Sequence, residues 1–174
     1  ALAYNARRLR DISGLDEVSF HMSGTEAVMQ AVRLARYHTK RQRCVAFLNA
    51  FHGRTVGALA LTSSRPNQQR GFGPMLGGVT HIPFSMEGLD YLENTLFRAN
   101  LPPEEVAAVV AEPIQAEGGC HVPAPDFLPR LRRICDQHGI MLVFDEIQTG
   151  LGRTGKLFAS EHWNVVPDIV CISK

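Results

Sequence analysis

The sequence predicts an α/β domain with a mostly parallel sheet and flanking helices. Apolar runs of strand length alternate along the chain with segments of helical periodicity, as when helices connect parallel strands. These runs are continuously apolar, which is typical of strands covered on both faces. Glu112, Asp145 and Lys174 stand at the ends of three of the runs. In open α/β sheets ligands bind at that carboxyl edge, so we expect the functional site there.

Residues 23–40 form the best-defined helix of the prediction. Ala27 and Ala31 recur on one face, as helical periodicity requires. Ser23 and Glu26 match the S-x-x-E capping box that marks a helix start. The first backbone N–H groups of this helix, together with its positive dipole end, suit a phosphate group.

The remaining elements follow from apolar runs, periodicity and turn residues. The expected strands are residues 44–49, 78–84, 106–114, 140–147 and 168–173. The expected helices are a segment that begins at Ala1, residues 88–99, residues 126–139 closed by Gly139, and a short one around 157–163. Residues 54–64 are ambiguous, and residues 65–78, rich in Pro, Gly and Gln, are expected to form a loop.

Composition narrows the class of protein. The chain has 174 residues, which suits one domain with a substantial core. Its net charge is +1 with both signs scattered, which does not indicate a nucleic acid or an anionic membrane as partner. No apolar run approaches the length of a membrane span, and no signal peptide is visible. The four cysteines are widely spaced, as expected of reduced thiols in a cytoplasmic protein.

The stretch 140–150, IMLVFDEIQTG, places carboxylates at the end of a buried strand. Ionised carboxylates beside a core are costly unless a cation or hydrogen-bond donors face them. Pyridoxal phosphate would meet this need, because Asp145 would hold its protonated pyridine nitrogen and Gln148 would reach the ring hydroxyl. Lys174 would form the Schiff base and then act as general base at the substrate carbon.

Two other stretches would bind the rest of this cofactor. At the helix start that Ser23 caps, Gly24 and Thr25 would hold the phosphate. Phe51, or the neighbouring His52, would stack on one face of the ring. Ile147 would cover the other face, so that the ring would lie between two separate parts of the chain.

At this point the sequence resembles the class III, or omega, aminotransferases of fold type I. The matching motifs are SGTEA (23–27), AFHGRT (50–55), RGFGPMLGGVTHIPF (70–84), EPIQAEGG (112–119), DEIQTGLGRTGK (145–156) and PDIVCISK (167–174). They run in the family's order over nearly the whole chain. The resemblance is closest to 4-aminobutyrate aminotransferases, with acetylornithine and ornithine aminotransferases as neighbours. It implies a fold type I large domain that binds pyridoxal phosphate.

The resemblance also implies substrates and further site residues. An amino donor with a terminal amine, such as 4-aminobutyrate, would pass its amino group to 2-oxoglutarate through the cofactor on Lys174. Glu117 would act as a switch by pairing with an arginine that lies beyond this stretch. Arg54 would contact a substrate carboxylate or form a structural salt bridge, and Glu112 would contact substrate or brace the site from behind. The implied assembly is a homodimer or higher.

The sequence departs from the family pattern at Met22, where Asn is common, and at Ala116, where the family has Gly. A methyl group at Ala116 could crowd the loop that carries Glu117, which affects substrate choice more than cofactor binding. Because both chain ends are abrupt, we expect residues 1–174 to be a partial large domain without the family's carboxyl-terminal small domain. Such a piece is expected to be inactive alone.

Two alternative interpretations use other residues. Residues 150–157, GLGRTGKL, nearly match a phosphate-binding P-loop of a nucleotide-binding domain, although Leu157 stands where Ser or Thr should bind magnesium. The same stretch contains the weak dinucleotide signal G-x-G-x-x-G. The second alternative is a structural zinc site formed by Cys120, His121, Cys135 and His138.

Overall fold

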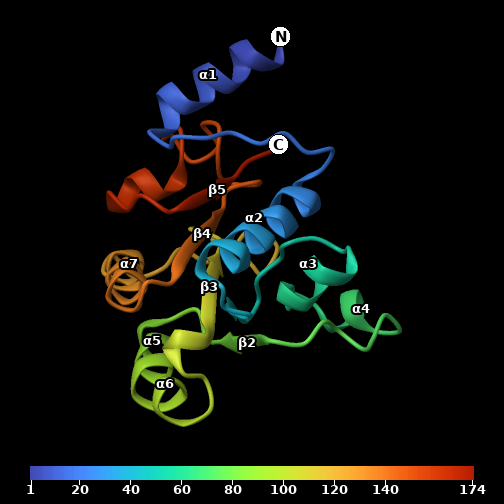
Figure 1. The fold of residues 1–174 in the computed structure, drawn as a ribbon, viewed down its shortest axis with the longest axis vertical. Helices are drawn as coiled ribbons and strands as arrows, with labels where there is room; N and C mark the ends of the chain where they lie inside the picture. The colour runs from blue at the N-terminus through green and yellow to red at the C-terminus, as the bar shows by residue number, and fades with distance from the viewer.

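The computed structural model describes residues 1–174. Its centre is a five-stranded sheet in the order β2-β1-β3-β4-β5 (Figure 1). The strands are β1 (Arg43–Phe47), β2 (Val79–Ile82), β3 (Val106–Ala111), β4 (Met141–Asp145) and β5 (Ile169–Cys171). Every neighbouring pair is parallel, which confirms the α/β fold with a parallel sheet that the sequence predicts.

Helices connect these strands. The α-helices are α1 (Leu2–Ser13), α2 (Gly24–Thr39), α3 (Val56–Leu61), α4 (Pro66–Gln69), α5 (Met86–Tyr91), α6 (Phe97–Ala99) and α7 (Phe127–His138). Short helical turns of other types are η1 (Leu92–Leu96), η2 (Pro103–Glu105) and η3 (Ala159–Trp163). The ambiguous stretch 54–64 therefore contains a helix, and the expected loop 65–78 includes the single turn of α4. None of these helices has the length and apolar character that a membrane crossing needs.

The sheet is covered on both faces, which explains its continuously apolar strands. Helix α2 packs on one face, while α5, η1 and α7 cover the other (Figure 1). Along β3 the side chains divide between the two cores: Val109 and Ala111 belong to the α7 side, and Ala108 and Val110 to the α2 side. This double coverage leaves the carboxyl ends of the strands as the place where polar groups gather.

All five strands end earlier than predicted, and at two of them the reason shapes the site. β3 stops at Ala111, and the next residue, Glu112, turns its carboxylate to the backbone N–H of Phe51 at 3.0 Å. β4 stops at Asp145, whose Oδ1 accepts the backbone N–H of Ile147 at 3.1 Å. Such a local turn competes with the strand ladder and ends it.

The start of α2 has the expected cap with one difference. Ser23 Oγ accepts the backbone N–H of Glu26 at 3.4 Å, as in a capping box. The Glu26 carboxylate, however, accepts the N–H of Met22 at 2.8 Å, one residue before the capping serine. The first N–H groups of α2 therefore remain at the carboxyl edge of the sheet without an intrahelical partner.

Candidate active site

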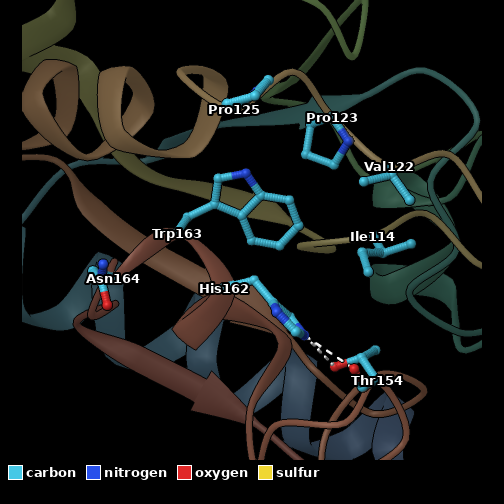
Figure 2. Close-up of a pocket in the computed structure, with 8 residues that line it drawn as sticks. All are labelled: Ile114, Val122, Pro123, Pro125, Thr154, His162, Trp163 and Asn164. Atoms are coloured by element: carbon cyan, nitrogen blue, oxygen red, sulfur yellow. Dashed lines mark hydrogen bonds between the residues drawn. The ribbon is translucent and has the colours of Figure 1, made fainter.

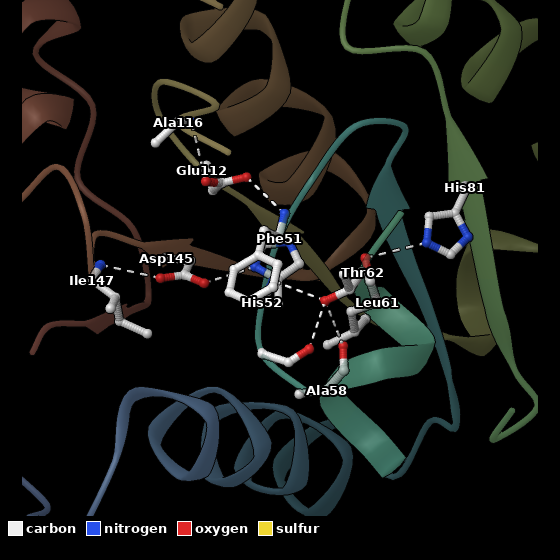
Figure 3. A network of polar contacts seen from close by, with 11 residues as sticks. Phe51, His52, Ala58, Leu61, Thr62, His81, Glu112, Ala116, Asp145 and Ile147 are labelled. Atoms are coloured by element: carbon white, nitrogen blue, oxygen red, sulfur yellow. Dashed lines mark hydrogen bonds and ion pairs between the residues drawn. The ribbon is translucent and has the colours of Figure 1, made fainter. Parts of the chain in front are cut away.

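A buried pair of titratable side chains lies where β1 and β4 end (Figure 3). His52 Nδ1 is 2.7 Å from Asp145 Oδ2, and both side chains are almost fully buried. The other oxygen of Asp145 accepts the N–H of Ile147. Asp145 is thus held by two contacts, and one of them comes from His52, which is distant in the sequence.

The charge state of His52 follows from these neighbours. Burial alone lowers its pKa, but the hydrogen bond to Asp145 and the negative charges of Asp145 and Glu112 raise the pKa of His52 overall. A protonated His52 stabilises negative charge on Asp145. The His52 backbone is fixed as well, because its N–H donates to Thr62 Oγ1 at 2.9 Å. The sequence analysis did not identify Thr62, which no motif marks.

This geometry changes the role expected for His52. Its ring is fully buried against Asp145, and its Nε2 is buried without a hydrogen-bond partner. A ring in this position holds Asp145 from behind. Of the two residues predicted to stack on the cofactor ring, only Phe51 remains a candidate. It is half-buried beside His52.

Glu112 is the third buried acid at this edge. Its Oε2 accepts the N–H of Phe51 at 3.0 Å and its Oε1 accepts the N–H of Ala116 at 3.3 Å (Figure 3). Burial raises the pKa of Glu112 to about 7, although the charge of His52 and these backbone donors oppose the rise. With 3% exposure and both oxygens engaged by backbone donors, Glu112 has the contacts expected of the bracing alternative.

Glu146, beside Asp145, is satisfied by donors from the following loop. Its carboxylate accepts the hydroxyl of Thr149 at 2.7 Å and the backbone N–H groups of Ala159 and Ser160 at 2.8 and 2.9 Å. This carboxylate therefore needs no cation. It fixes the glycine-rich loop, a role that the sequence did not reveal.

The same contacts contradict the P-loop alternative for residues 150–157. A P-loop leads directly into a helix whose free N–H groups bind phosphate. Here the loop leads into the five-residue turn η3, and the first N–H groups of η3 are taken by Glu146. Lys156 is exposed on this loop.

The start of α2 meets two other segments closely. A Cβ on Gly24 would lie 2.8 Å from Ile147 Cδ1, so only glycine allows Ile147 to reach this helix start. A Cβ on Gly53 would lie 2.2 Å from Thr25 Oγ1, and the φ of Gly53 is +120°, so this glycine is required as well. Thr25 Oγ1 also lies 2.9 Å from Thr55 Oγ1, which places two hydroxyl groups beside the helix N-terminus.

The remaining predicted residues lie around this edge. Lys174 is exposed, and its backbone N–H donates to the carbonyl of Ile147 at 3.3 Å. Gln148 is half-buried. Arg54 is exposed and forms no ion pair within residues 1–174.

Glu117 has an arginine partner within this chain. Its carboxylate is 3.8 Å from the guanidinium of Arg65, and both side chains are more than a third exposed. A contact of this length in solvent is weak. Glu117 is therefore free to exchange Arg65 for another cation.

The zinc alternative has no support in the geometry. Cys120 and His121 are exposed on a loop, whereas Cys135 is buried on α7. No group of three or more His, Cys, Asp or Glu side chains could hold a metal ion. Burial raises the pKa of the Cys135 thiol to about 12, which disfavours the thiolate that zinc requires.

A cavity lies apart from these groups. It has a volume of about 600 Å³ and is formed by the loop after β3 together with η3 (Figure 2). Its lining residues are Ile114, Val122, Pro123, Pro125, Thr154, His162, Trp163 and Asn164. None of them belongs to the predicted site. The candidate site is instead at His52, Glu112 and Asp145, because the pKa values of His52 and Glu112 are both raised and His52 pairs with Asp145.

Comparison with known proteins gives consistent matches. The family model described as aminotransferase class-III matches residues 2–174. The chain is 42% identical to an acetylornithine aminotransferase of Methanopyrus kandleri, over 92% of this chain and 39% of that protein. It is 40% identical to an alanine/serine racemase of Pyrococcus horikoshii, over 97% of this chain and 40% of that protein.

A solved structure also matches nearly the whole chain. An amine transaminase from an uncultivated Pseudomonas species, in its PLP-bound form, superposes with a TM-score of 0.92 at 30% identity. The match covers 99% of this chain and 44% of that chain. The chain thus spans about two fifths of the length of the curated relatives it matches.

Glu112→Gln is expected to flatten the pH dependence of the free energy of unfolding between about pH 4.5 and 7. In the folded protein this carboxyl keeps its proton up to about pH 7, whereas the unfolded chain releases it near pH 4.5. Its stabilising contribution is therefore complete below pH 4.5 and decreases by about 3 kcal/mol as the pH rises to 7. Glutamine cannot titrate and lacks this decrease.

Urea unfolding followed by circular dichroism at several pH values measures the difference. The exposed Glu104→Gln serves as the matched control and should keep the wild-type slope. Parallel profiles for Glu112→Gln and wild type would contradict the raised pKa.

Proposed function

This chain belongs to the class III aminotransferase family, and on that premise we propose that the protein transfers an amino group from a donor with a terminal amine to 2-oxoglutarate. Family members use an amino donor and a keto acid. The observation that carries the proposal is the buried His52–Asp145 pair beside the start of α2. It combines negative charge for a cationic ring with a helix terminus for a phosphate.

The family and its PLP-bound neighbours imply pyridoxal phosphate as the cofactor. The residues present fit this group. The first N–H groups of α2 and the paired hydroxyls of Thr25 and Thr55 suit a phosphate. The carboxylate of Asp145, backed by His52, suits a protonated ring nitrogen. Gly24 and Gly53 allow Ile147 and the Thr25 side chain to lie close to this helix start.

When bound, the cofactor supplies an electron sink for the carbon that loses a proton. Asp145 would hold the ring nitrogen protonated, and His52 would hold Asp145 in position and charge. Phe51 and Ile147 would cover the two ring faces and exclude water. Lys174 would bind the cofactor covalently and, through its amine Nζ, move the proton at the amine-bearing carbon of the donor.

The donor class rests on Glu117 and on the family. Its partner Arg65 is weakly held, so Glu117 can take a stronger cationic partner while the bound donor has no carboxylate on the carbon that bears the reacting amine. 4-Aminobutyrate, acetylornithine and ornithine each present a terminal amine. The relative from Methanopyrus kandleri is named an acetylornithine aminotransferase, which supports this donor class. Arg54, exposed and unpaired, would bind a substrate carboxylate.

A second candidate function is racemisation of a small amino acid. The relative from Pyrococcus horikoshii, named an alanine/serine racemase, is 40% identical over nearly all of this chain. Racemisation needs the same cofactor and the same proton-moving lysine but no keto acid. Interconversion of D- and L-alanine without 2-oxoglutarate would distinguish it.

The proposal also covers the domain that contains the site, the assembly of the protein and its location in the cell. Residues 1–174 would form part of the cofactor-binding domain, in a homodimer or higher assembly. A cytoplasmic location is supported by the absence of disulfides among the cysteines, of which Cys44, Cys135 and Cys171 are buried.

Borohydride reduction of the PLP-loaded protein is expected to fix the pyridoxyl group on Lys174. Lys174 is adjacent in structure to the loop that follows Asp145, since its N–H donates to Ile147. Digestion and mass spectrometry locate the label, and Lys156→Met is the control that should leave labelling unchanged. A label on Lys40 or Lys156 would refute this attachment.

A panel of amino donors, assayed with the full-length protein that contains residues 1–174, tests the reaction itself. With 2-oxoglutarate as acceptor, we expect glutamate to form from 4-aminobutyrate, acetylornithine or ornithine and much less from alanine or serine. The parallel assay measures D- to L-alanine conversion without a keto acid. Exclusive use of α-amino acids would contradict the proposed donor class, and racemisation alone would favour the second candidate.

A further inference from the structure

Glu112 connects two parts of the site that are far apart in the sequence. One carboxylate oxygen accepts the N–H of Phe51, in the segment after β1, and the other accepts the N–H of Ala116, in the loop after β3 (Figure 3). The side chain is 3% exposed, so both bonds form in a dry environment where a lost partner is costly. The two segments are therefore held at a fixed separation by one side chain.

The loop held in this way carries Glu117. Ala116 precedes Glu117 directly, and Gly118 follows it, packed so closely that a Cβ there would lie 2.4 Å from the carbonyl oxygen of Asn49. Gln115 adds a bond from Nε2 to the carbonyl of Leu48 at 2.8 Å. All of these anchors join the loop after β3 to the segment after β1.

Glu112 differs from the other anchors in two respects. It alone also bonds the backbone of Phe51, the residue expected to stack on the cofactor ring. It is also the only one that needs a carboxyl group, because two backbone donors face its two oxygens and both oxygens must accept. Glutamine would turn an NH₂ group toward one of these N–H donors and break that bond.

We propose that Glu112 is a positioning residue for donor specificity, which it exerts by holding Glu117 at a fixed place relative to the ring face covered by Phe51. The inference rests on the proposed role of Glu117 in binding donors with a terminal amine. Glu112 itself touches no substrate, since both of its oxygens face backbone donors. It acts through the Glu117 loop.

A double-mutant cycle in the PLP-loaded, full-length protein that contains residues 1–174 tests this mechanism, and wild type below means that protein. Glu112→Gln is expected to raise the KM for acetylornithine or 4-aminobutyrate about tenfold, while kcat and the KM for 2-oxoglutarate change less than about threefold. Because Glu112 acts through Glu117, adding Glu112→Gln to Glu117→Gln should raise the donor KM less than about twofold further. Glu104→Gln, an exposed acid before β3, is the matched control.

The possible results separate the inference from the proposed function. If wild type transfers no amino group from any terminal-amine donor, the proposed function fails. If wild type is active and Glu112→Gln matches Glu104→Gln, or if the effects of Glu112→Gln and Glu117→Gln multiply, the inference is overturned and the function stands. Should Glu112→Gln fold poorly, Glu112→Asp keeps the charge with a shorter reach, and an unchanged donor KM in that variant would overturn the inference equally.

Discussion

The site depends on one buried contact, the 2.7 Å hydrogen bond between His52 and Asp145. A carboxylate at the end of a buried strand is unfavourable unless it is paired. His52 supplies the partner from another strand end, and its pKa rises as a result of the acids around it. Asp145 thus has a cationic partner in an almost fully buried place, an arrangement that suits the binding of a cationic ring.

The parallel sheet makes this contact available. Since β1, β3 and β4 run in the same direction, the residues that follow each strand meet at one edge: His52, Glu112 and Asp145. Helix α2 starts at the same edge, with Gly24 beside Ile147. The three carboxylates there have two kinds of hydrogen-bond partner. Asp145 is bound by an imidazole, whereas Glu112 and Glu146 are bound by backbone N–H groups. Only Asp145 is paired with a group that carries charge.

Much of this arrangement could be predicted from the sequence. Run length and periodicity identified the parallel sheet and helix α2, and the place of Asp145 at a strand end pointed to the site. The local partners could not be predicted, because they depend on contacts between segments distant in sequence. His52 looked like a ring-stacking residue and instead binds Asp145. Glu146 is one of the carboxylates at the end of stretch 140–150 for which a nearby cation was expected. It instead accepts hydrogen bonds from the chain that follows it.

The central claim is that His52 carries a proton to stabilise charge on Asp145, and the titration of His52 tests it most directly. Nitrogen-15 NMR of the imidazole, in wild type and in Asp145→Asn, measures the pKa of this one ring. The account predicts a pKa above the ordinary value of 6.5 in wild type and a lower one in the variant, where burial acts without the neighbouring charge. A wild-type pKa at or below 6.5, or one that Asp145→Asn leaves unchanged, would contradict it.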